Sequence, residues 1–475
     1  MMYSSPYSKI KARNLKLILF FTILCGLSIF SYYFYFLLQL INYEFALSIE
    51  EGKNLYYTNI SDLAFQGNNI FYSLFLKIFT LITKDFFIFR IISFFALFAL
   101  IYKFFKLNTK EKVLPIFSFI SILLFLSLTL TQINSIQAVP YIFALFLDLL
   151  GLSLYFSLNN EDSQLIRIFK SLFIYLFFIL GLVLTDKLTF LCFPLFLLIN
   201  FNKSKNLTII TMASVILILF IKSLFFNNYL SWKLLNLFSN LNWLIESWSL
   251  LTILIVLSPF MPYKNMNIKH PAIFIFVVAT ILSIIDSGFD NNSSGIWLIS
   301  AFAFSWITAL SLNYIYNKKS NSLIINFLPI FLILLLIQTP ILGNPLLVKL
   351  SKNSALIKST NFWLEEKENK KLEILELPTQ DMSLALFTKS KAIDLYKISK
   401  EDLENKKFKY IVLKNKTDLN ISPELLNLIY ENYSPLYRLI VATEEGFLYV
   451  RKTDKYNINE ISEAHNVFAT FYPNN

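Results

Sequence analysis

Residues 16–41, KLILFFTILCGLSIFSYYFYFLLQLI, contain one charged side chain in 26 positions, the lysine that opens the run. An uncharged apolar run of this length predicts a helix that crosses a membrane, since a spanning helix needs about 20 apolar residues. Lys9, Lys11 and Arg13 precede the run, and no small-residue cleavage site follows it. These features predict a signal anchor, with residues 1–15 as a cytoplasmic tail.

Further apolar segments follow the first one along most of the chain. The chain is 56% hydrophobic with a mean hydropathy of +0.58, whereas a soluble protein averages about 45–50% apolar residues. These properties predict a polytopic α-helical membrane protein with about 11 transmembrane helices, contained in residues 16–345. The spans after the first are predicted at 86–106, 112–131, 136–157, 168–185, 188–201, 207–226, 247–261, 271–286, 296–316 and 323–341.

The basic residues of the membrane part gather in alternate loops. Loops on the side of the N-terminal tail carry 16 Lys/Arg, whereas the opposite side carries 7. The positive-inside rule then predicts an inner (cytoplasmic) membrane protein with a cytoplasmic N-terminus. Residues 349–475 are nearly neutral, with 19 Lys/Arg and 18 Asp/Glu, so the net charge of +11 belongs to membrane loops. This charge is therefore no sign of nucleic-acid binding.

The segment between the first two spans is predicted to form a large outer loop, residues 42–85. Its apolar part, Ile70–Thr83, is about 14 residues long and contains Lys77, which makes it short for a span. A span here would also invert the charge asymmetry of every later loop. We therefore expect an interfacial helix on the outer surface.

The composition changes after Lys349, where charged residues become frequent and apolar runs shorten. Alternating and amphipathic patterns predict strands at 372–377, 410–413 and 447–450, and helices at 399–407 and 423–432. Residues 346–475 are therefore predicted to form a small soluble α/β domain. An odd number of spans places this domain on the extracytoplasmic side.

An acidic pair, Glu50 and Glu51, lies in the outer loop close to the predicted membrane boundary. A carboxylate there acts as a general base if it reaches an acceptor hydroxyl. Lys53, Arg90 and Lys187 are predicted on the same side, where such cations bind a phosphate and stabilise it as a leaving group. A transferase with a lipid-phosphate donor requires a base and a phosphate anchor on one membrane face.

Several short motifs occur in order around these residues. The acidic pair precedes Gly52-Lys-Asn-Leu-Tyr56, and Gly67-Asn-Asn-Ile-Phe-Tyr72 comes next. Arg90-Ile-Ile-Ser93 enters the second span, and Gly181-Leu-Val-Leu-Thr-Asp-Lys187 ends the fifth. As a set, over residues 15–200, they resemble the GT-C superfamily of polyprenyl-phosphate-sugar-dependent glycosyltransferases. The resemblance is to the protein O-mannosyltransferase and aminoarabinose-transferase type.

This resemblance implies a GT-C-like fold and assigns roles to single residues. Glu50, followed by Glu51, takes the place of the family's catalytic acid. Lys187 matches a lysine near the end of the family's fifth span, and Arg90 matches the arginine of its Arg-Leu-Pro-Ser element. The chain departs from the family pattern in three ways. Its first acid is Glu instead of Asp, Asp186 precedes the lysine, and the glycine–asparagine element has lost the family's prolines.

Other polar residues predicted on the same side are candidates for lining the substrate site. They are Tyr56, Asn68, Asn69, Gln137 and Asp290. For the last four of these, an ordinary turn or loop role is the alternative interpretation. Asp148 lies within a predicted span, and we expect it to form an interhelical hydrogen bond.

No motif requires a cofactor. Both cysteines fall in apolar segments and the two histidines are far apart, so no metal-ligand spacing occurs. Glu50, Glu51 and Asp290 leave a divalent cation open, because carboxylate oxygens suit such an ion without histidine.

The predicted function is an inverting glycosyltransferase. It moves a sugar from a polyprenyl-phosphate carrier to a lipid, glycan or protein acceptor on the outer face of the membrane. Glu50 is the predicted base, and Lys187 with Arg90 or Lys53 holds the phosphate. Two alternatives stay open: a lipid-linked glycan transporter or flippase, and a non-catalytic envelope assembly protein. A transporter predicts an internal repeat and broken mid-membrane helices, neither of which is evident in the sequence.

Overall fold

The computed structural model of the chain divides into two compact units. The first, here the helical unit, comprises Met1–Ile41, Asn68–Tyr72 and Asp85–Asn344, and the second comprises Asn42–Gly67, Ser73–Lys84 and Pro345–Asn475. The described residues are 16–31, 70–79, 86–128, 131, 134–135, 137, 139–158, 163–185, 187–199, 201, 204–225, 270–289, 295–317, 373–377, 391–392, 410–414, 437–443 and 446–451. The predicted spans at 247–261 and 323–341 lie outside these residues.

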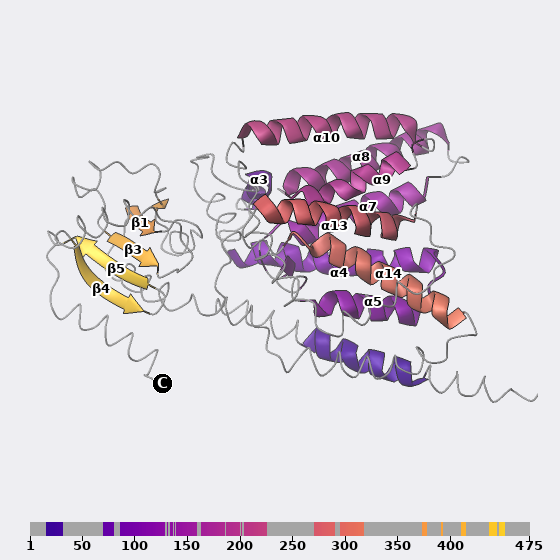
Figure 1. The fold of residues 1–475 in the computed structure, drawn as a ribbon, viewed down its shortest axis with the longest axis horizontal. Helices are drawn as coiled ribbons and strands as arrows, with labels where there is room; N and C mark the ends of the chain where they lie inside the picture. Colours follow the sequence, from indigo (N-terminus) through magenta and orange to yellow (C-terminus); the bar gives the residue numbers. More distant parts are fainter. Residues whose placement is uncertain are drawn as a thin grey trace, which may run out of the picture. The chain divides into compact units, whose positions relative to one another are not determined.

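The helical unit is built of long apolar helices that lie side by side with their axes close to parallel (Figure 1). They are Lys16–Ser31, α4 Phe86–Lys110, α5 Pro115–Ser127, α7 Tyr141–Phe156, α8 Gln164–Leu184, η1 Leu188–Leu191 running into α9 Cys192–Ile199, α10 Lys205–Phe225, α13 Pro271–Phe289 and α14 Leu298–Asn317. Each predicted span that falls in the described residues contains a helix, although residues at the ends of several spans are not helical. A separate helix, α3 Ile70–Phe79, covers most of the predicted interfacial segment, and its interfacial position stays a prediction.

Helix α14 lies in the centre of this unit. From Leu298 to Thr308 every one of its side chains is buried, with Phe302 and Trp306 packed against Phe104 of α4. A helix that is buried all round belongs in the core of a bundle. It packs against α5 and α13.

Helices α8 and α10 show the opposite pattern, because large apolar side chains on them are exposed. Leu165, Phe169 and Phe173 of α8 are 67%, 53% and 48% exposed, and Ile216 and Phe220 of α10 are 68% and 59% exposed. A soluble surface does not tolerate an apolar area of this kind, whereas lipid does. By length and composition, two described helices, Arg90–Lys110 and Gln164–Leu184, suffice to cross a membrane. The structure is therefore that of a helical membrane protein.

Two helices extend beyond their predicted spans, which corrects the predicted span ends. The helix over the predicted span 86–106 continues to Lys110, and α8 begins at Gln164, before the predicted span 168–185. Lysine and arginine are good helix formers, and their long side chains reach polar surroundings from a helix end. Ser163 caps α8 by accepting a hydrogen bond from the Ile166 N–H at 3.5 Å. Basic residues therefore lie near the predicted ends of these helices, but the helices continue through them.

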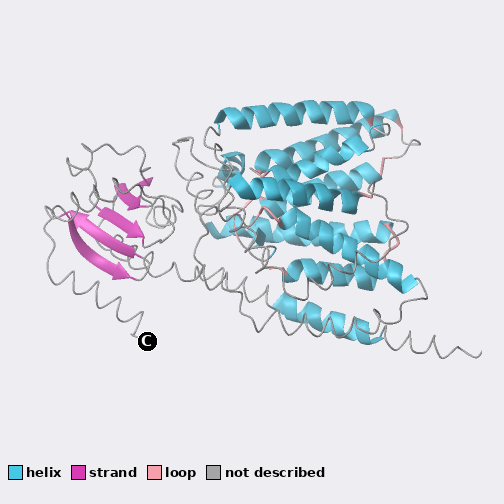
Figure 2. Ribbon diagram, viewed as in Figure 1, coloured by secondary structure: helices cyan, strands magenta, loops and turns pink. Residues whose placement is uncertain are grey.

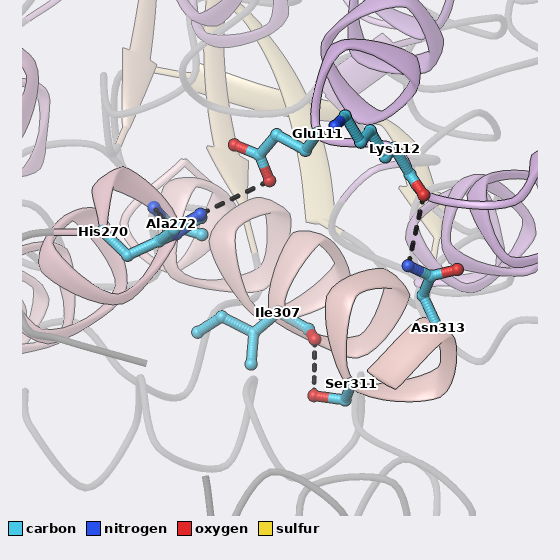
Figure 3. A network of polar contacts seen from close by, with 7 residues as sticks. All are labelled: Glu111, Lys112, His270, Ala272, Ile307, Ser311 and Asn313. Carbon is cyan, nitrogen blue, oxygen red and sulfur yellow. Dashed lines mark hydrogen bonds and ion pairs between the residues drawn. The ribbon is translucent and has the colours of Figure 1, made fainter. Parts of the chain in front are cut away.

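The α4–α5 turn is tied to α14 by the side chain of Asn313. Its Nδ2 donates to the Lys112 carbonyl at 3.3 Å (Figure 3), and its Oδ1 accepts from the Leu114 N–H at 3.1 Å. Lys112 adopts a left-handed conformation with φ 59°, which costs a non-glycine residue energy. His270, before α13, lies 3.4 Å from Glu111 through its Nε2 and the carboxylate Oε2. We call this end of the bundle the Lys112 end.

Asn313→Ala is expected to lower the free energy of unfolding by about 1–3 kcal/mol, because two hydrogen bonds to a strained turn are lost. Thermal or detergent unfolding of the purified protein measures this change. Ser311→Ala is the matched control, since its hydroxyl donates only within α14, to the Ile307 carbonyl at 2.6 Å (Figure 3). An equal cost for both variants would contradict the bridging role of Asn313.

All the described strands form one five-stranded sheet in the second unit (Figure 2). The strands are β1 Glu373–Leu377, β2 Lys391–Ala392, β3 Tyr410–Lys414, β4 Tyr437–Thr443 and β5 Gly446–Arg451, in the order β2-β1-β3-β5-β4. β1 is parallel to β2 and β3, while β5 is antiparallel to β3 and β4. Strands β1, β3 and β5 confirm the three predicted strands. The two predicted helices of this domain lie outside the described residues.

Candidate functional site

The end of the bundle opposite to the Lys112 end brings together segments that are far apart in sequence. The Ser93 hydroxyl of α4 donates to the Val139 carbonyl before α7 at 3.2 Å. The Thr189 N–H of η1 donates to the Asp286 carboxylate of α13 at 3.0 Å. A Cβ on Gly295, before α14, would lie 2.5 Å from the Tyr141 ring, so this ring packs directly on the glycine. We call this the Lys187 end.

Helix α5 ends early at the Lys187 end. Helix α5 has 13 residues, or about 20 Å at 1.5 Å per residue, against a hydrocarbon core of about 30 Å. The next long helix, α7, begins at Tyr141, and of the residues described between the two helices Thr131, Asn134 and Ser135 are helical. This segment carries buried polar side chains, Asn134, Ser135 and Gln137.

Three predicted site residues lie in the described part of this end. Arg90, in α4, is 7% exposed, Gln137 is 3% exposed, and Lys187, between α8 and η1, is 3% exposed. Arginine and lysine are almost never buried to this extent unless their charge is compensated. The structure therefore groups two buried cations and a buried amide at one end of the bundle.

The remaining predicted site residues lie outside the described part of the chain, and their roles stay predictions. They are Glu50, Glu51, Lys53, Tyr56, Asn68, Asn69 and Asp290. No metal-like cluster of three or more His, Cys, Asp or Glu occurs among the residues that the structure does describe. That finding does not test the prediction of a cation bound by Glu50, Glu51 and Asp290, because none of the three is among the described residues.

Lys187 is held in an extended stretch between two helices. Helix α8 ends at Leu184, and the Thr185 hydroxyl donates to the Gly181 carbonyl at 3.1 Å. Lys187 has φ −89° and ψ 131°, and η1 begins at the next residue. Its backbone carbonyl accepts from the Phe190 N–H at 3.4 Å. Lysine 187 is therefore the last extended residue before a new helix.

Asp286 is a residue whose role the sequence did not indicate. It is the last residue of the predicted span 271–286; in the structure it lies within α13, is 6% exposed and accepts the Thr189 N–H. Helix α13 continues to Phe289, three residues beyond the predicted span end. The partners are 97 positions apart, so no local pattern reveals the pair.

Buried hydrogen-bonding groups without a partner also occur at this end. The Thr189 hydroxyl, the Thr131 hydroxyl and the Trp297 Nε1 are inaccessible and have no hydrogen-bond partner among the described residues. Buried polar groups in proteins are nearly always paired. Such groups are free to bind a polar ligand such as a phosphate or a sugar hydroxyl.

Asp148 of α7 is fully buried against α8. A Cβ on Gly181 would lie 2.6 Å from Asp148 Oδ1 and 2.8 Å from its Oδ2, so the carboxyl group occupies the space that the glycine leaves. Neither carboxyl oxygen has a hydrogen-bond partner in the structure. The expectation of an interhelical hydrogen bond was therefore wrong, because Asp148 faces a backbone surface without a free donor.

No protein-family model and no curated protein matches the sequence. Solved structures do match: ArnT from Cupriavidus metallidurans bound to undecaprenyl phosphate has a TM-score of 0.59 at 8% identity, covering 90% of this chain and 98% of ArnT. The apo state of the same ArnT gives a TM-score of 0.55 at 8% identity, covering 85% and 94%. This chain therefore shares its overall fold with ArnT.

Proposed function

We propose that this protein is a glycosyltransferase that takes a sugar from a polyprenyl-phosphate donor and transfers it to an acceptor on the outer face of the inner membrane. The observation that carries the proposal is the burial of Arg90, Gln137 and Lys187 at one end of an apolar bundle. Buried cations in a membrane protein mark a functional site by default, and an anionic phosphate suits them. ArnT, which shares this fold, is bound to undecaprenyl phosphate in one of its structures.

The proposed reaction divides the chemistry between an acid pair and the buried cations. Glu50 takes the proton of the acceptor hydroxyl, whose oxygen attacks the anomeric carbon of the sugar. The bond between that carbon and the phosphate oxygen breaks, and the phosphate leaves with the electron pair. Attack opposite to the leaving group inverts the anomeric centre. The N-terminus is cytoplasmic and the C-terminal domain extracytoplasmic in this proposal.

Lys187, with Arg90 or Lys53, stabilises the phosphate that leaves. Its negative charge grows as the sugar bond breaks, and cations held in place in a poorly solvated site stabilise this charge more strongly than water does. An unpartnered hydroxyl such as that of Thr189 adds a hydrogen-bond donor for a phosphate oxygen. The acceptor (lipid, glycan or protein) is selected at the outer surface.

Lys187→Ala is expected to weaken binding of undecaprenyl phosphate by about 10- to 100-fold, since a hydrogen bond to a charged group contributes about 1.5–3 kcal/mol. Native mass spectrometry of the protein in lipid nanodiscs measures this binding. Lys106→Ala is the matched control, because Lys106 lies near the Lys112 end, exposed, with its Nζ 4.7 Å from the Tyr102 ring centroid. It is expected to leave binding within about twofold.

Two results would contradict the proposal. One is wild-type protein that does not bind undecaprenyl phosphate, and the other is equal binding by the wild type and Lys187→Ala. Comparison of envelope lipids and glycoproteins by mass spectrometry, with and without the protein, then identifies the sugar and the acceptor. An unchanged set of glycans would favour the non-catalytic assembly role.

A further inference from the structure

The contact between Asp286 and Thr189 fixes the start of the helix that follows Lys187. The first N–H groups of any helix have no partner within the helix. Here the Asp286 carboxylate accepts the Thr189 N–H at 3.0 Å, and both residues are buried, 6% and 0% exposed. A carboxylate at this place also interacts favourably with the helix dipole. Asp286 thus caps η1 from a different helix, as an N-cap residue does from its own chain.

This cap lies two residues after Lys187, and the intervening backbone has little freedom. Lys187 is extended, its carbonyl accepts the Phe190 N–H at 3.4 Å, and Leu188 opens η1. A shift of η1 along α13 would therefore carry the Lys187 backbone with it. On the other side, the Thr185 hydroxyl is bonded to the Gly181 carbonyl at 3.1 Å. The position of the lysine is thus set from both neighbouring helices.

We propose that Asp286 is a positioning residue for Lys187, a role that rests on the proposed function of Lys187 as a phosphate anchor. Asp286 holds η1 against α13, so that the Lys187 ammonium group stays where the donor phosphate binds. Asp286 is not itself a phosphate ligand, because two anions repel each other. Since its carboxylate already takes the Thr189 N–H, that donor is not offered to the phosphate. The Lys187 ammonium group, not the backbone N–H of Thr189, is the main phosphate anchor.

A positioning role predicts that Asp286 acts only through Lys187. Asp286→Ala removes the acceptor and is expected to weaken binding of undecaprenyl phosphate at least fivefold. Asp286→Asn keeps a side-chain oxygen for the Thr189 N–H and is expected to stay within about twofold of the wild type. In a Lys187→Ala background, Asp286→Ala is expected to cause no further loss. Effects of residues that act through one another are not additive.

Ser283→Ala is the matched control for general damage to α13. Ser283 lies one turn before Asp286, is buried, and donates to the Ile296 carbonyl, in the segment before α14, at 2.8 Å. Its loss is expected to lower the unfolding temperature as much as Asp286→Ala does while leaving undecaprenyl phosphate binding within about twofold.

Native mass spectrometry of the full-length protein in nanodiscs, with undecaprenyl phosphate as the probe, gives all of these values. Loss in Asp286→Ala, rescue in Asp286→Asn and non-additivity with Lys187→Ala support the inference. Additive losses, or wild-type binding by Asp286→Ala, overturn it while the difference between wild type and Lys187→Ala upholds the proposed function. Absence of binding by the wild type overturns both.

Discussion

Gly181→Ala is expected to destabilise the protein by about 1–3 kcal/mol, the usual cost of an overpacked core. The new methyl group would lie 2.6 Å from Asp148 Oδ1 and 2.8 Å from its Cγ, closer than real side chains approach. Asp148 has a short side chain and is fully buried, so its carboxyl group has no open space to enter. Relief therefore requires α7 and α8 to separate. Detergent unfolding followed by circular dichroism measures the loss.

The second-site variant Asp148→Ala tests the cause of this loss. It deletes the atoms that the new methyl group would meet, so the double variant is expected to regain most of the lost stability. Asp148→Ala alone is expected to cost little, because the carboxyl group it removes is buried without a hydrogen-bond partner. Gly181 and Asp148 are in contact, and coupling of this kind is what a double-mutant cycle detects.

Gly26→Ala is the matched control for the effect of a methyl group on a membrane helix. Its Cβ would meet only Leu123 Cδ2, at 3.9 Å, which is an ordinary contact. It is expected to be neutral or slightly stabilising, since alanine favours a helix more than glycine does. If Gly181→Ala is also neutral, or if Asp148→Ala fails to restore the stability lost in Gly181→Ala, the contact with Asp148 does not explain why residue 181 is glycine.

The positions of the membrane helices could be read from the sequence because lipid demands long apolar runs. Their ends were less predictable. Helix α4 continues past the predicted span end at residue 106 as far as Lys110, since lysine combines helix propensity with a long flexible side chain. Helix α5 ends early, at Ser127, although no glycine or proline lies near that position in the sequence. Tertiary packing sets such ends, and a single sequence does not reveal it.

The candidate site was predicted in part. Counting spans placed Arg90, Gln137 and Lys187 on one side, and the structure finds all three buried at one end of the bundle. The Asp286–Thr189 pair and the Asp148–Gly181 contact escaped prediction, since both join distant segments. One signal was available in the sequence. The chain has only 9 glycines in 475 residues, so a glycine within a predicted span indicates a place where a neighbouring helix packs closely.

Glu50→Gln is expected to reduce sugar transfer by about 10²- to 10⁴-fold, the range lost when a general base is removed. The amide has nearly the shape of the carboxylate but takes no proton. Binding of undecaprenyl phosphate is expected to stay within about twofold of the wild type, because Glu50 acts on the acceptor. Single-turnover transfer from a polyprenyl-phosphate sugar, with binding measured separately, distinguishes these two effects.

Substitution of neighbouring carboxylates decides whether the effect belongs to Glu50. Glu44→Gln removes a charge from the same predicted outer loop and is expected to leave transfer unchanged. Glu51→Gln is expected to cause a smaller loss than Glu50→Gln, and the reverse order would move the base to Glu51. Full transfer by both Glu50→Gln and Glu51→Gln, each expressed at the normal level, would show that the acid pair has no part in the mechanism. Because Lys187→Ala impairs binding and Glu50→Gln impairs chemistry, the two variants together separate a phosphate anchor from a base.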